Sequence, residues 1–308
     1  MPTINENSII ELASKLFNIS ILDDIGICKV GSYELALNID TFVKSTDAPS
    51  KMKPYYIGWK SVVSSLSDLY VKGVKPLALL VSLGLNSTVA KHIDEVLNGI
   101  KDASEYYQVP IAKWDTNKCR DMFISVASIG KINGYVPLRK NAKVGDVVVV
   151  SGYFGLEGLG LSILQGEIKV RDPEIRKIAI ESFCMPKPNF KKYEDLIKIG
   201  INASIDSSDG LARSLWILSK ESFVKIKLFK IPVHPLVEKA ITLPELRRRL
   251  ALYSGEEYIG IFMVPKDKAH LAEEYGFIPI GEAIDKGIGV YDTEGNLIED
   301  IGYVHRIG

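Results

Sequence analysis

Cysteine is scarce in this chain, and the few cysteines form no pattern. Three are spread over 308 residues, at Cys28, Cys119 and Cys184, and no two of them make a CxxC pair. Structural zinc sites and disulfide frameworks need cysteines at close or regular spacing. Neither is therefore expected to support the fold, and a reducing cytoplasm is the expected compartment.

An excess of charge and a long apolar run are also missing. Lys and Arg together number 38, as do Asp and Glu, so the formal net charge is zero and the broad basic field of a non-specific nucleic-acid binder is absent. The longest apolar stretch, residues 77–85, is far shorter than the roughly 18 residues that suggest a membrane span. Residues 1–7 are polar and acidic, unlike a signal peptide. We expect a cytoplasmic protein that binds neither nucleic acid nor membrane.

The common nucleotide and zinc motifs are absent as well. There is no GxxxxGK[ST] phosphate loop, no GxGxxG after a strand and no HExxH pair. The four histidines stand far apart, so each is more simply explained as a surface residue than as a base or a metal ligand. Any chemistry must come from other residue types.

Strand-like and helix-like stretches alternate through both halves of the chain. Alternating apolar residues predict a strand over residues 34–40, and apolar residues at helical spacing predict a helix over residues 57–72. The length favours two domains of roughly 150 residues each. Because residues 137–145 are polar and basic, we expect one α/β domain over residues 1–137 and a second over residues 138–308. Further predicted strands are residues 77–83, 109–114, 122–129, 146–150, 204–206 and 258–264, and further predicted helices are residues 88–107, residues 189–199 and one beginning near Asp209.

Aspartates recur beside the apolar segments, several of them where a predicted strand ends. They are Asp23, Asp24, Asp40, Asp68, Asp115, Asp206 and Asp209. Carboxylates at strand ends can converge above one sheet, where ligands bind in open α/β folds. Two bare carboxylates about 4 Å apart repel by a few kcal/mol at an effective dielectric of about 20, so a converged cluster would need hard cations such as Mg²⁺. The alternative is that they are helix caps and turn residues, and the spacing leaves both interpretations open.

Two further segments have features of phosphate sites. Residues 208–210 (Ser-Asp-Gly) precede a predicted amphipathic helix, whose N-terminal amides and dipole attract phosphate. Four glycines follow a predicted strand, where backbone without side chains can approach a polyphosphate. They are Gly152, Gly155, Gly158 and Gly160. Tight packing of a helix explains the same glycines equally well.

A series of motifs in fixed order carries a family resemblance. Residues 57–76, which include Lys60, Ser67, Asp68 and Gly73, resemble the IGxKAxxxNxSDLAAxGAxP block of thiamine-monophosphate kinases. The other matches are Leu22-Asp23-Asp24 to the family's GDD, Ile39-Asp40-Thr41 to TDT, Asp115-Thr116-Asn117 to GGDT/N, residues 205–211 to IDxSDGL and residues 253–258 to SGGEDYE. These kinases share a superfamily with aminoimidazole-ribotide synthetase, selenophosphate synthetase and a hydrogenase-maturation dehydratase. The match covers nearly the whole chain, and residues 46–49 are most similar to archaeal kinases.

The resemblance implies a two-domain α/β fold like that of aminoimidazole-ribotide synthetase. The N-terminal domain, residues 1–137, would bind ATP and magnesium and form a homodimer through its sheet, beside the C-terminal α/β domain, residues 138–308. The terminal phosphoryl group of ATP would pass directly to thiamine monophosphate, giving thiamine diphosphate and ADP. The cofactor would be Mg²⁺, as more than one ion.

The resemblance also implies roles for individual residues. The metal ligands would be Asp24, Asp40, Asp68, Asp115, Asp206 and Asp209, with no catalytic side chain beyond them. The nucleotide would contact Trp114, Asp115, Arg139 and Ser208. Asp47 and Glu256 would face the thiamine end, where a carboxylate suits the cationic thiazolium. Phosphoryl transfer needs alignment and neutralisation of charge, which a carboxylate cage filled with Mg²⁺ provides.

Two alternatives remain open on the sequence. One is another ATP-using member of the superfamily that acts on a different small acceptor. The lack of cysteine in residues 1–22 and near residue 308 argues against the selenophosphate-synthetase and hydrogenase-maturation branches. The other is a non-catalytic nucleotide-binding paralogue, suggested by Lys113 and Trp114 where the family has two glycines, and by Ile39 where it has Ser or Thr.

Overall fold

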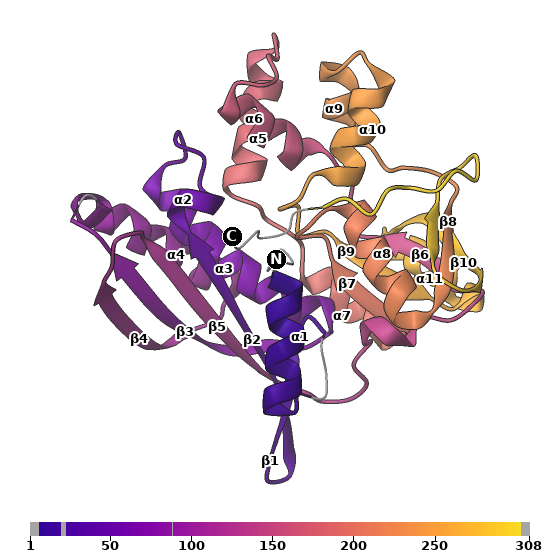
Figure 1. The fold of residues 1–308 in the computed structure, drawn as a ribbon, viewed down its shortest axis with the longest axis horizontal. Coiled ribbons are helices and arrows are strands. Elements are labelled where there is room, and N and C mark those ends of the chain that lie inside the picture. Colours follow the sequence, from indigo (N-terminus) through magenta and orange to yellow (C-terminus); the bar gives the residue numbers. More distant parts are fainter. Residues whose placement is uncertain (1–5, 20–22, 88, 303–308) are drawn as a thin grey trace.

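The computed structural model describes residues 6–19, 23–87 and 89–302, which form two β-sheets with helices packed around them (Figure 1). The first sheet has five strands in the order β1-β2-β5-β3-β4, and only β3 and β4 run parallel. These strands are β1 (Gly26–Val30), β2 (Tyr33–Val43), β3 (Pro76–Leu85), β4 (Ile111–Lys118) and β5 (Phe123–Lys131). Helix α3 (Pro54–Val71) packs on one face of this sheet, and α4 (Ile93–Tyr107) packs along α3. Two shorter helices, α1 (Glu6–Phe17) and α2 (Lys44–Asp47), complete this half.

The second sheet has six strands in the order β11-β8-β10-β6-β9-β7, and only β11 and β8 run parallel. The strands are β6 (Val147–Val150), β7 (Ala203–Asp206), β8 (Val224–Leu228), β9 (Gly260–Val264), β10 (Ile278–Lys286) and β11 (Gly289–Tyr291). The helices of this half are α5 (Leu156–Gln165), α6 (Pro173–Cys184), α7 (Lys191–Lys198), α8 (Leu211–Ser222), α9 (Pro235–Ala240), α10 (Pro244–Tyr253) and α11 (Ala269–Glu274). The chain is therefore mixed α/β throughout, as the sequence pattern predicts.

Helix α3 lies between the two halves and is buried on most of its surface. It packs against β2 and β5 on one side and against β7 on the other. Gly58 and Gly99 let α3 and α4 cross closely, because a Cβ at Gly58 would lie 2.1 Å from the carbonyl oxygen of Val96. Because α3 is buried on most of its surface, it belongs to the core, and the polar side chains that it carries are held in fixed positions.

One apolar cluster joins the two halves. It includes Trp59 and Tyr70 from α3 and Phe190, Tyr193 and Phe262 from the second half. The rings of Tyr70 and Phe190 stack with their centroids 4.6 Å apart, and Trp59 Nε1 donates a hydrogen bond to the carbonyl oxygen of Pro186 at 2.8 Å. Because both sheets contribute to this one core cluster, its packing holds one sheet in place relative to the other.

Most predicted elements form close to the predicted residues, with local differences. The predicted helix 88–107 begins as α4 only at Ile93, after a 3₁₀ turn over Val89–His92. The predicted strand 109–114 is β4, which continues to Lys118 and so contains Asp115. Strand β2 alternates as predicted: Ala36 and Phe42 are buried and Ile39 is exposed. The alternation directs Asn38 and Asp40 toward α3 and leaves Ile39 on the opposite face.

The glycine-rich segment serves close packing. Gly155 precedes α5 with φ +98°, and a Cβ at Gly160 would lie 2.0 Å from the carbonyl oxygen of Ala179 in α6. A Cβ at Gly158 would lie 1.9 Å from Ser254 Oγ. Of the two interpretations of these glycines, tight helix packing is the one that the structure favours.

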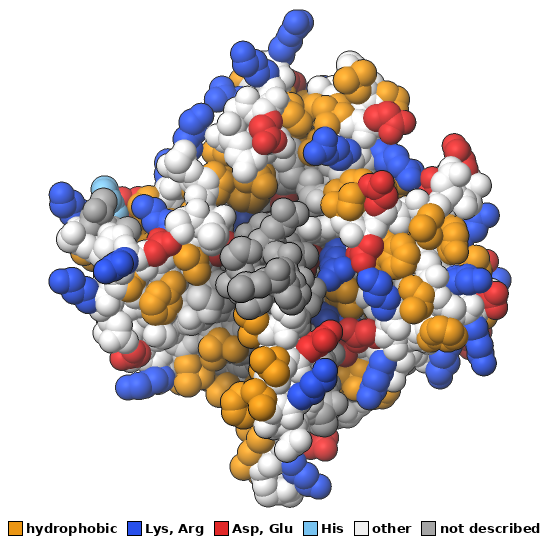
Figure 2. Space-filling model, in the orientation of Figure 1, with side chains coloured by type: hydrophobic (Ala, Val, Ile, Leu, Met, Phe, Trp, Pro, Cys, Tyr) orange, Lys and Arg blue, Asp and Glu red, His pale blue; other side chains and the backbone are white. Residues whose placement is uncertain are grey.

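Helix α1 presents an apolar surface. The side chains of Ile9, Leu12, Leu16 and Phe17 are exposed, and apolar side chains gather around this helix in Figure 2. Across the three described stretches of chain, no helix combines the length and apolar character needed to cross a bilayer.

Candidate active site

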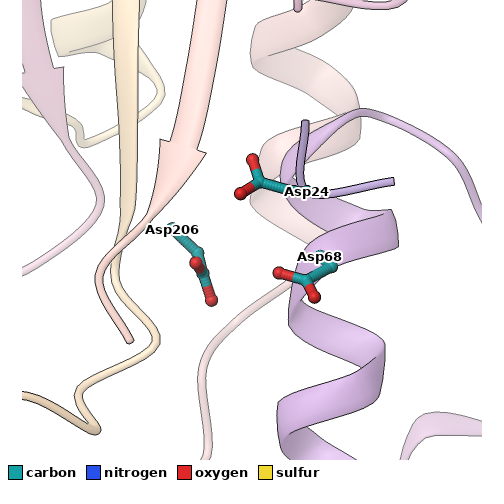
Figure 3. A group of neighbouring side chains, drawn as sticks. All are labelled: Asp24, Asp68 and Asp206. Carbon is teal, nitrogen blue, oxygen red and sulfur yellow. The ribbon is translucent and has the colours of Figure 1, made fainter. Parts of the chain in front are cut away.

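Three aspartates from distant parts of the chain meet between the two halves. Asp24 precedes β1, Asp68 lies on α3 and Asp206 is the last residue of β7. Their carboxylates extend into one common space, and one oxygen from each lies within 4.8 Å of the others (Figure 3). The convergence predicted for these three aspartates is therefore present.

Neutral donors hold the group in place. Asn38 Nδ2 donates to Asp68 Oδ2 at 2.7 Å and to Asp40 Oδ2 at 3.0 Å, and Ser67 Oγ donates to Asp206 Oδ2 at 2.6 Å. Neither Asn38 nor Ser67 was assigned a role from the sequence, although Ser67 lies in the motif of residues 57–76. The period of two along β2 was the available signal for Asn38, because it puts Asn38 and Asp40 on the same face.

Burial makes this group electrostatically unfavourable in the absence of a cation. It raises the pKa of Asp68 well above its usual range, and the charges of Asp206 and Asp40 raise it further. Burial also raises the pKa of Asp206, against the opposing effect of the hydrogen bond from Ser67. A nearby divalent cation reverses such shifts, because it favours the ionised carboxylates.

The donor set fits magnesium. All three groups offer carboxylate oxygens, the hard ligands that Mg²⁺ prefers. Asp24 Oδ2 is buried and ion-paired with Lys72, whose Nζ lies 2.9 Å away. A carboxylate oxygen has two lone pairs, so this ion pair leaves one for a metal.

Two cations of the chain surround the Asp23–Asp24 pair. Lys72 Nζ lies 2.6 Å from Asp23 Oδ1, and its side chain is completely buried. Arg139 forms an ion pair with Asp24, and its backbone N–H donates to Asp23 Oδ2 at 2.8 Å. Arg139, predicted to contact the nucleotide, is thus engaged with these carboxylates at the edge of the cavity. Leu22, the first residue of the predicted GDD match, lies outside the described residues.

A cavity of about 350 Å³ adjoins the aspartates. It is polar, and residues of both halves line it. Its lining includes nine of the predicted site residues, Asp24, Asp40, Asp47, Asp68, Arg139, Asp206, Ser208, Asp209 and Glu256. The structure therefore brings these nine residues to one space, whatever role each has.

The two residues predicted to face thiamine are held by different contacts. Asp47, in α2, accepts a hydrogen bond from the backbone N–H of Val43 at 2.7 Å. Glu256 has φ +69°, forms an ion pair with the fully buried Lys60 and accepts a hydrogen bond from Tyr258 at 3.2 Å. Lys60 was not assigned a role from the sequence, although the motif around it was noted.

Trp114 and Asp115 lie apart from this cavity. Both are on β4, the edge strand, and neither lines it. Asp115 pairs across the sheet with Ser82, Ser82 with Ser125, and Ser125 with Thr41. Paired residues point to the same face, so Asp115 shares a face with Thr41 and points to the side opposite to Asp40. Three strand spacings, about 14 Å, separate Asp115 from Thr41. Within one chain Asp115 does not join Asp24, Asp68 and Asp206.

A second buried acidic pair lies beside another cavity, of about 460 Å³. Glu157 and Glu257 both line it, and the backbone N–H of Gly155 donates to Glu257 Oε1 at 2.5 Å. Burial raises the pKa of Glu257 well above its usual range and that of Glu157 to about 7. Neither glutamate was predicted as a site residue.

Comparisons with known proteins agree with one another. Residues 22–132 match the family "AIR synthase related protein, N-terminal domain". The chain is 32% identical to a thiamine-monophosphate kinase of Pyrococcus abyssi, covering 99% of this chain and 97% of the relative. It is 33% identical to that of Pyrococcus horikoshii, covering 100% and 98%. A solved structure of AaThiL complexed with AMPPCP and TMP superposes with a TM-score of 0.88 at 27% identity, covering 98% of this chain and 97% of that one.

Proposed function

The chain belongs to the thiamine-monophosphate kinase family, and on that premise we propose that it transfers the terminal phosphoryl group of ATP to thiamine monophosphate. The products are thiamine diphosphate and ADP. The observation that carries the proposal is the aspartate group, which opens into a polar cavity between the halves. The fold around it matches that of a protein complexed with AMPPCP and TMP. That combination supports a phosphotransferase over a binding protein without catalysis.

We propose that Asp24, Asp68 and Asp206 hold magnesium, with Asp40 and Asp209 at the same cavity and more than one ion bound. Bound magnesium would neutralise the oxygens of the triphosphate. Asn38 and Ser67 orient the carboxylates through the hydrogen bonds described above. Positioning of this kind is a large part of catalysis in phosphoryl transfer.

The reaction needs no general base from the protein. An oxygen of the thiamine monophosphate phosphate forms the new bond to the γ-phosphorus of ATP, and the bond from that phosphorus to the β–γ bridging oxygen breaks. A phosphate monoester has a second pKa of about 6, so it is largely dianionic and nucleophilic at neutral pH. A reaction without a general base agrees with this cavity, because the predicted site residues that line it are carboxylates, one arginine and one serine.

The remaining residue roles are proposals of the same kind. Ser208 borders the cavity just before α8, and Arg139 borders it at the junction between the halves. Both would contact the nucleotide there. Asp47 and Glu256 line the same cavity, and their negative charge suits the thiazolium cation. The change of sheet between residues 131 and 147 supports a domain division near residue 137. Use of ATP supports a cytoplasmic location.

We propose a homodimer formed through the first sheet. Its face opposite α3 exposes Leu37 and Ile39 on β2, and Ile39 is 68% exposed. Asp115 points to this same face. Trp114, paired with the buried Val81, points to the opposite face and packs against the core of its own chain. A second copy across the face opposite α3 would bring Asp115 to the neighbouring chain's cavity, which it does not reach in its own.

The purified protein, incubated with ATP, Mg²⁺ and thiamine monophosphate, should form thiamine diphosphate and ADP in equal amounts. Asp68→Asn should lower kcat/KM by at least about 100-fold, because one carboxylate ligand is lost where charge develops. Asp195→Asn, which alters an exposed carboxylate paired with Lys198, is the matched control and should keep wild-type activity. Absence of thiamine diphosphate above the Asp68→Asn background would refute the proposal.

A further inference from the structure

A buried lysine stands next to the aspartate group. Lys72 follows the last turn of α3, and its side chain has no exposed surface. Its ammonium donates to the carbonyl oxygens of Ser204 and Pro137, at 2.5 and 3.3 Å, and lies 2.6 Å from Asp23 Oδ1. Lys72 Nζ also lies 2.9 Å from Asp24 Oδ2, so its charge compensates both aspartates.

The two sides of the aspartate group differ in how charge is compensated. Asp23 and Asp24 directly contact two cations of the chain, Lys72 and Arg139. The direct contacts of Asp68 and Asp206 are to neutral donors, from Asn38, Ser67 and Ser208. An external cation is therefore needed most at Asp68 and Asp206, while the Asp23–Asp24 side already carries resident positive charge.

We propose that Lys72 is a resident counter-ion that takes the place of a divalent cation at the Asp23–Asp24 pair. It holds Asp24 beside Asp68 and Asp206 and leaves one lone pair of Oδ2 for a metal, so the carboxylate pocket is assembled before magnesium and nucleotide arrive. This rests on the proposed function, since it concerns the same metal site. Lys72 is a positioning residue, because it acts through Asp24.

The consequence is a coupling between Lys72 and divalent cations. Without the ammonium, Arg139 alone opposes two adjacent carboxylates, of which the Asp24 side chain is 1% exposed. Removing one partner from a buried ion pair is strongly destabilising. A divalent cation can then restore the missing charge, so the stability of a Lys72 variant should depend on magnesium far more than that of the wild type.

The test is thermal unfolding of the full chain without nucleotide, once in EDTA and once in saturating MgCl₂. Lys72→Met keeps the length of the side chain and should lower Tm in EDTA by about 6–10 °C. Magnesium should recover at least half of that loss. Lys75→Met, which removes an exposed lysine three residues away, is the matched control and should behave as wild type in both buffers.

Two results would overturn the proposal. If Lys72→Met lowers Tm relative to wild type by the same amount in both buffers, Lys72 only anchors the carbonyl groups of Pro137 and Ser204. If Lys72→Met has wild-type Tm in EDTA, the ammonium is not a needed counter-ion. Kinase activity of the wild-type preparation tests the proposed function separately, since the unfolding experiment uses neither ATP nor thiamine monophosphate.

A second pair of variants covers the case in which Lys72→Met does not fold. The double variant Asp23→Asn/Lys72→Met removes one buried carboxylate with the cation, so the charge left unopposed is smaller. Its increase in Tm on adding magnesium should exceed that of Asp23→Asn alone, in which Lys72 still opposes Asp24. Equal increases in the two proteins would overturn the proposal.

Discussion

Two groups of buried acids in this molecule share one electrostatic property and differ in their surroundings. Burial raises the pKa of Asp68 and Asp206 in the first group and of Glu157 and Glu257 in the second. The first group comprises oxygens of three aspartates within 4.8 Å, beside Lys72 and Arg139. In the second, an oxygen of each glutamate lacks a hydrogen-bond partner among the described residues, and Glu257 accepts a hydrogen bond from the backbone N–H of Gly155.

The difference shows that a raised pKa does not identify a metal site by itself. Burial produces the shift in both places, but among the described residues only the aspartates bring three carboxylates together in direct contact with cations of the chain. The glutamates instead fit the other way of accommodating a buried acid, which is to keep it protonated. The comparison predicts that the two groups respond differently to the same change, from carboxylate to neutral amide.

The largest difference is expected in catalysis. Asp206→Asn should lower kcat/KM for thiamine diphosphate formation by at least about 100-fold, because a charged ligand of the metal is lost. Glu257→Gln should keep activity close to wild type, because Glu257 lies outside the aspartate group and burial favours its neutral form by raising its pKa. Steady-state kinetics on both variants, with circular dichroism to check folding, measures this. Equal losses in the two variants would remove the distinction between the groups.

A smaller difference is expected in the pH dependence of stability. The folded-state pKa of Glu257 is raised above its usual value of 4.5, so the folded chain holds a proton that the unfolded chain releases. Stability is therefore lost as pH rises from 4.5 toward the folded pKa. Glu257→Gln should unfold about 2–5 °C above wild type at pH 8 and at nearly the same temperature near pH 4.5. A variant less stable than wild type at pH 8 would show that Glu257 is ionised and compensated.

The finest difference concerns whether a second chain adds a carboxylate to the aspartate group. Asp68→Asn and Asp115→Asn should each be nearly inactive. If Asp115 serves the neighbouring chain, mixed dimers hold one intact site, and an equal mixture after subunit exchange should recover about a quarter of wild-type activity. No recovery, with dimer exchange verified by mass spectrometry of differently labelled chains, would place Asp115 outside the neighbouring site.

Much of the fold could be predicted from the sequence because its signals are local. Strand β2 alternates with a period of two, and α3 carries apolar residues at helical spacing, so both were located within a few residues. The end of β7 at Asp206 and the start of α8 after Gly210 followed from the same patterns. The convergence of Asp24, Asp68 and Asp206 was expected from their positions beside apolar segments and from the family motifs.

What the sequence did not reveal depends on contacts between distant segments. Lys72 reads as an ordinary helix-end lysine, because its partners Asp23 and Ser204 lie far away along the chain. Nor does the spacing of Asp115 show that β4 is an edge strand on which this side chain faces away from Asp40. Strand order and face are set by packing in three dimensions, which periodicity in one segment does not encode.

The central claim is that aspartates from both halves of the chain hold divalent metal against the triphosphate of ATP. The most direct measurement is anomalous diffraction from crystals grown with Mn²⁺ and AMPPCP. The account predicts a manganese peak in contact with the carboxylates of Asp24, Asp68 and Asp206 and with phosphate oxygens. Manganese bound to the nucleotide but away from Asp68 and Asp206, or found at Glu157 and Glu257 instead, would contradict it.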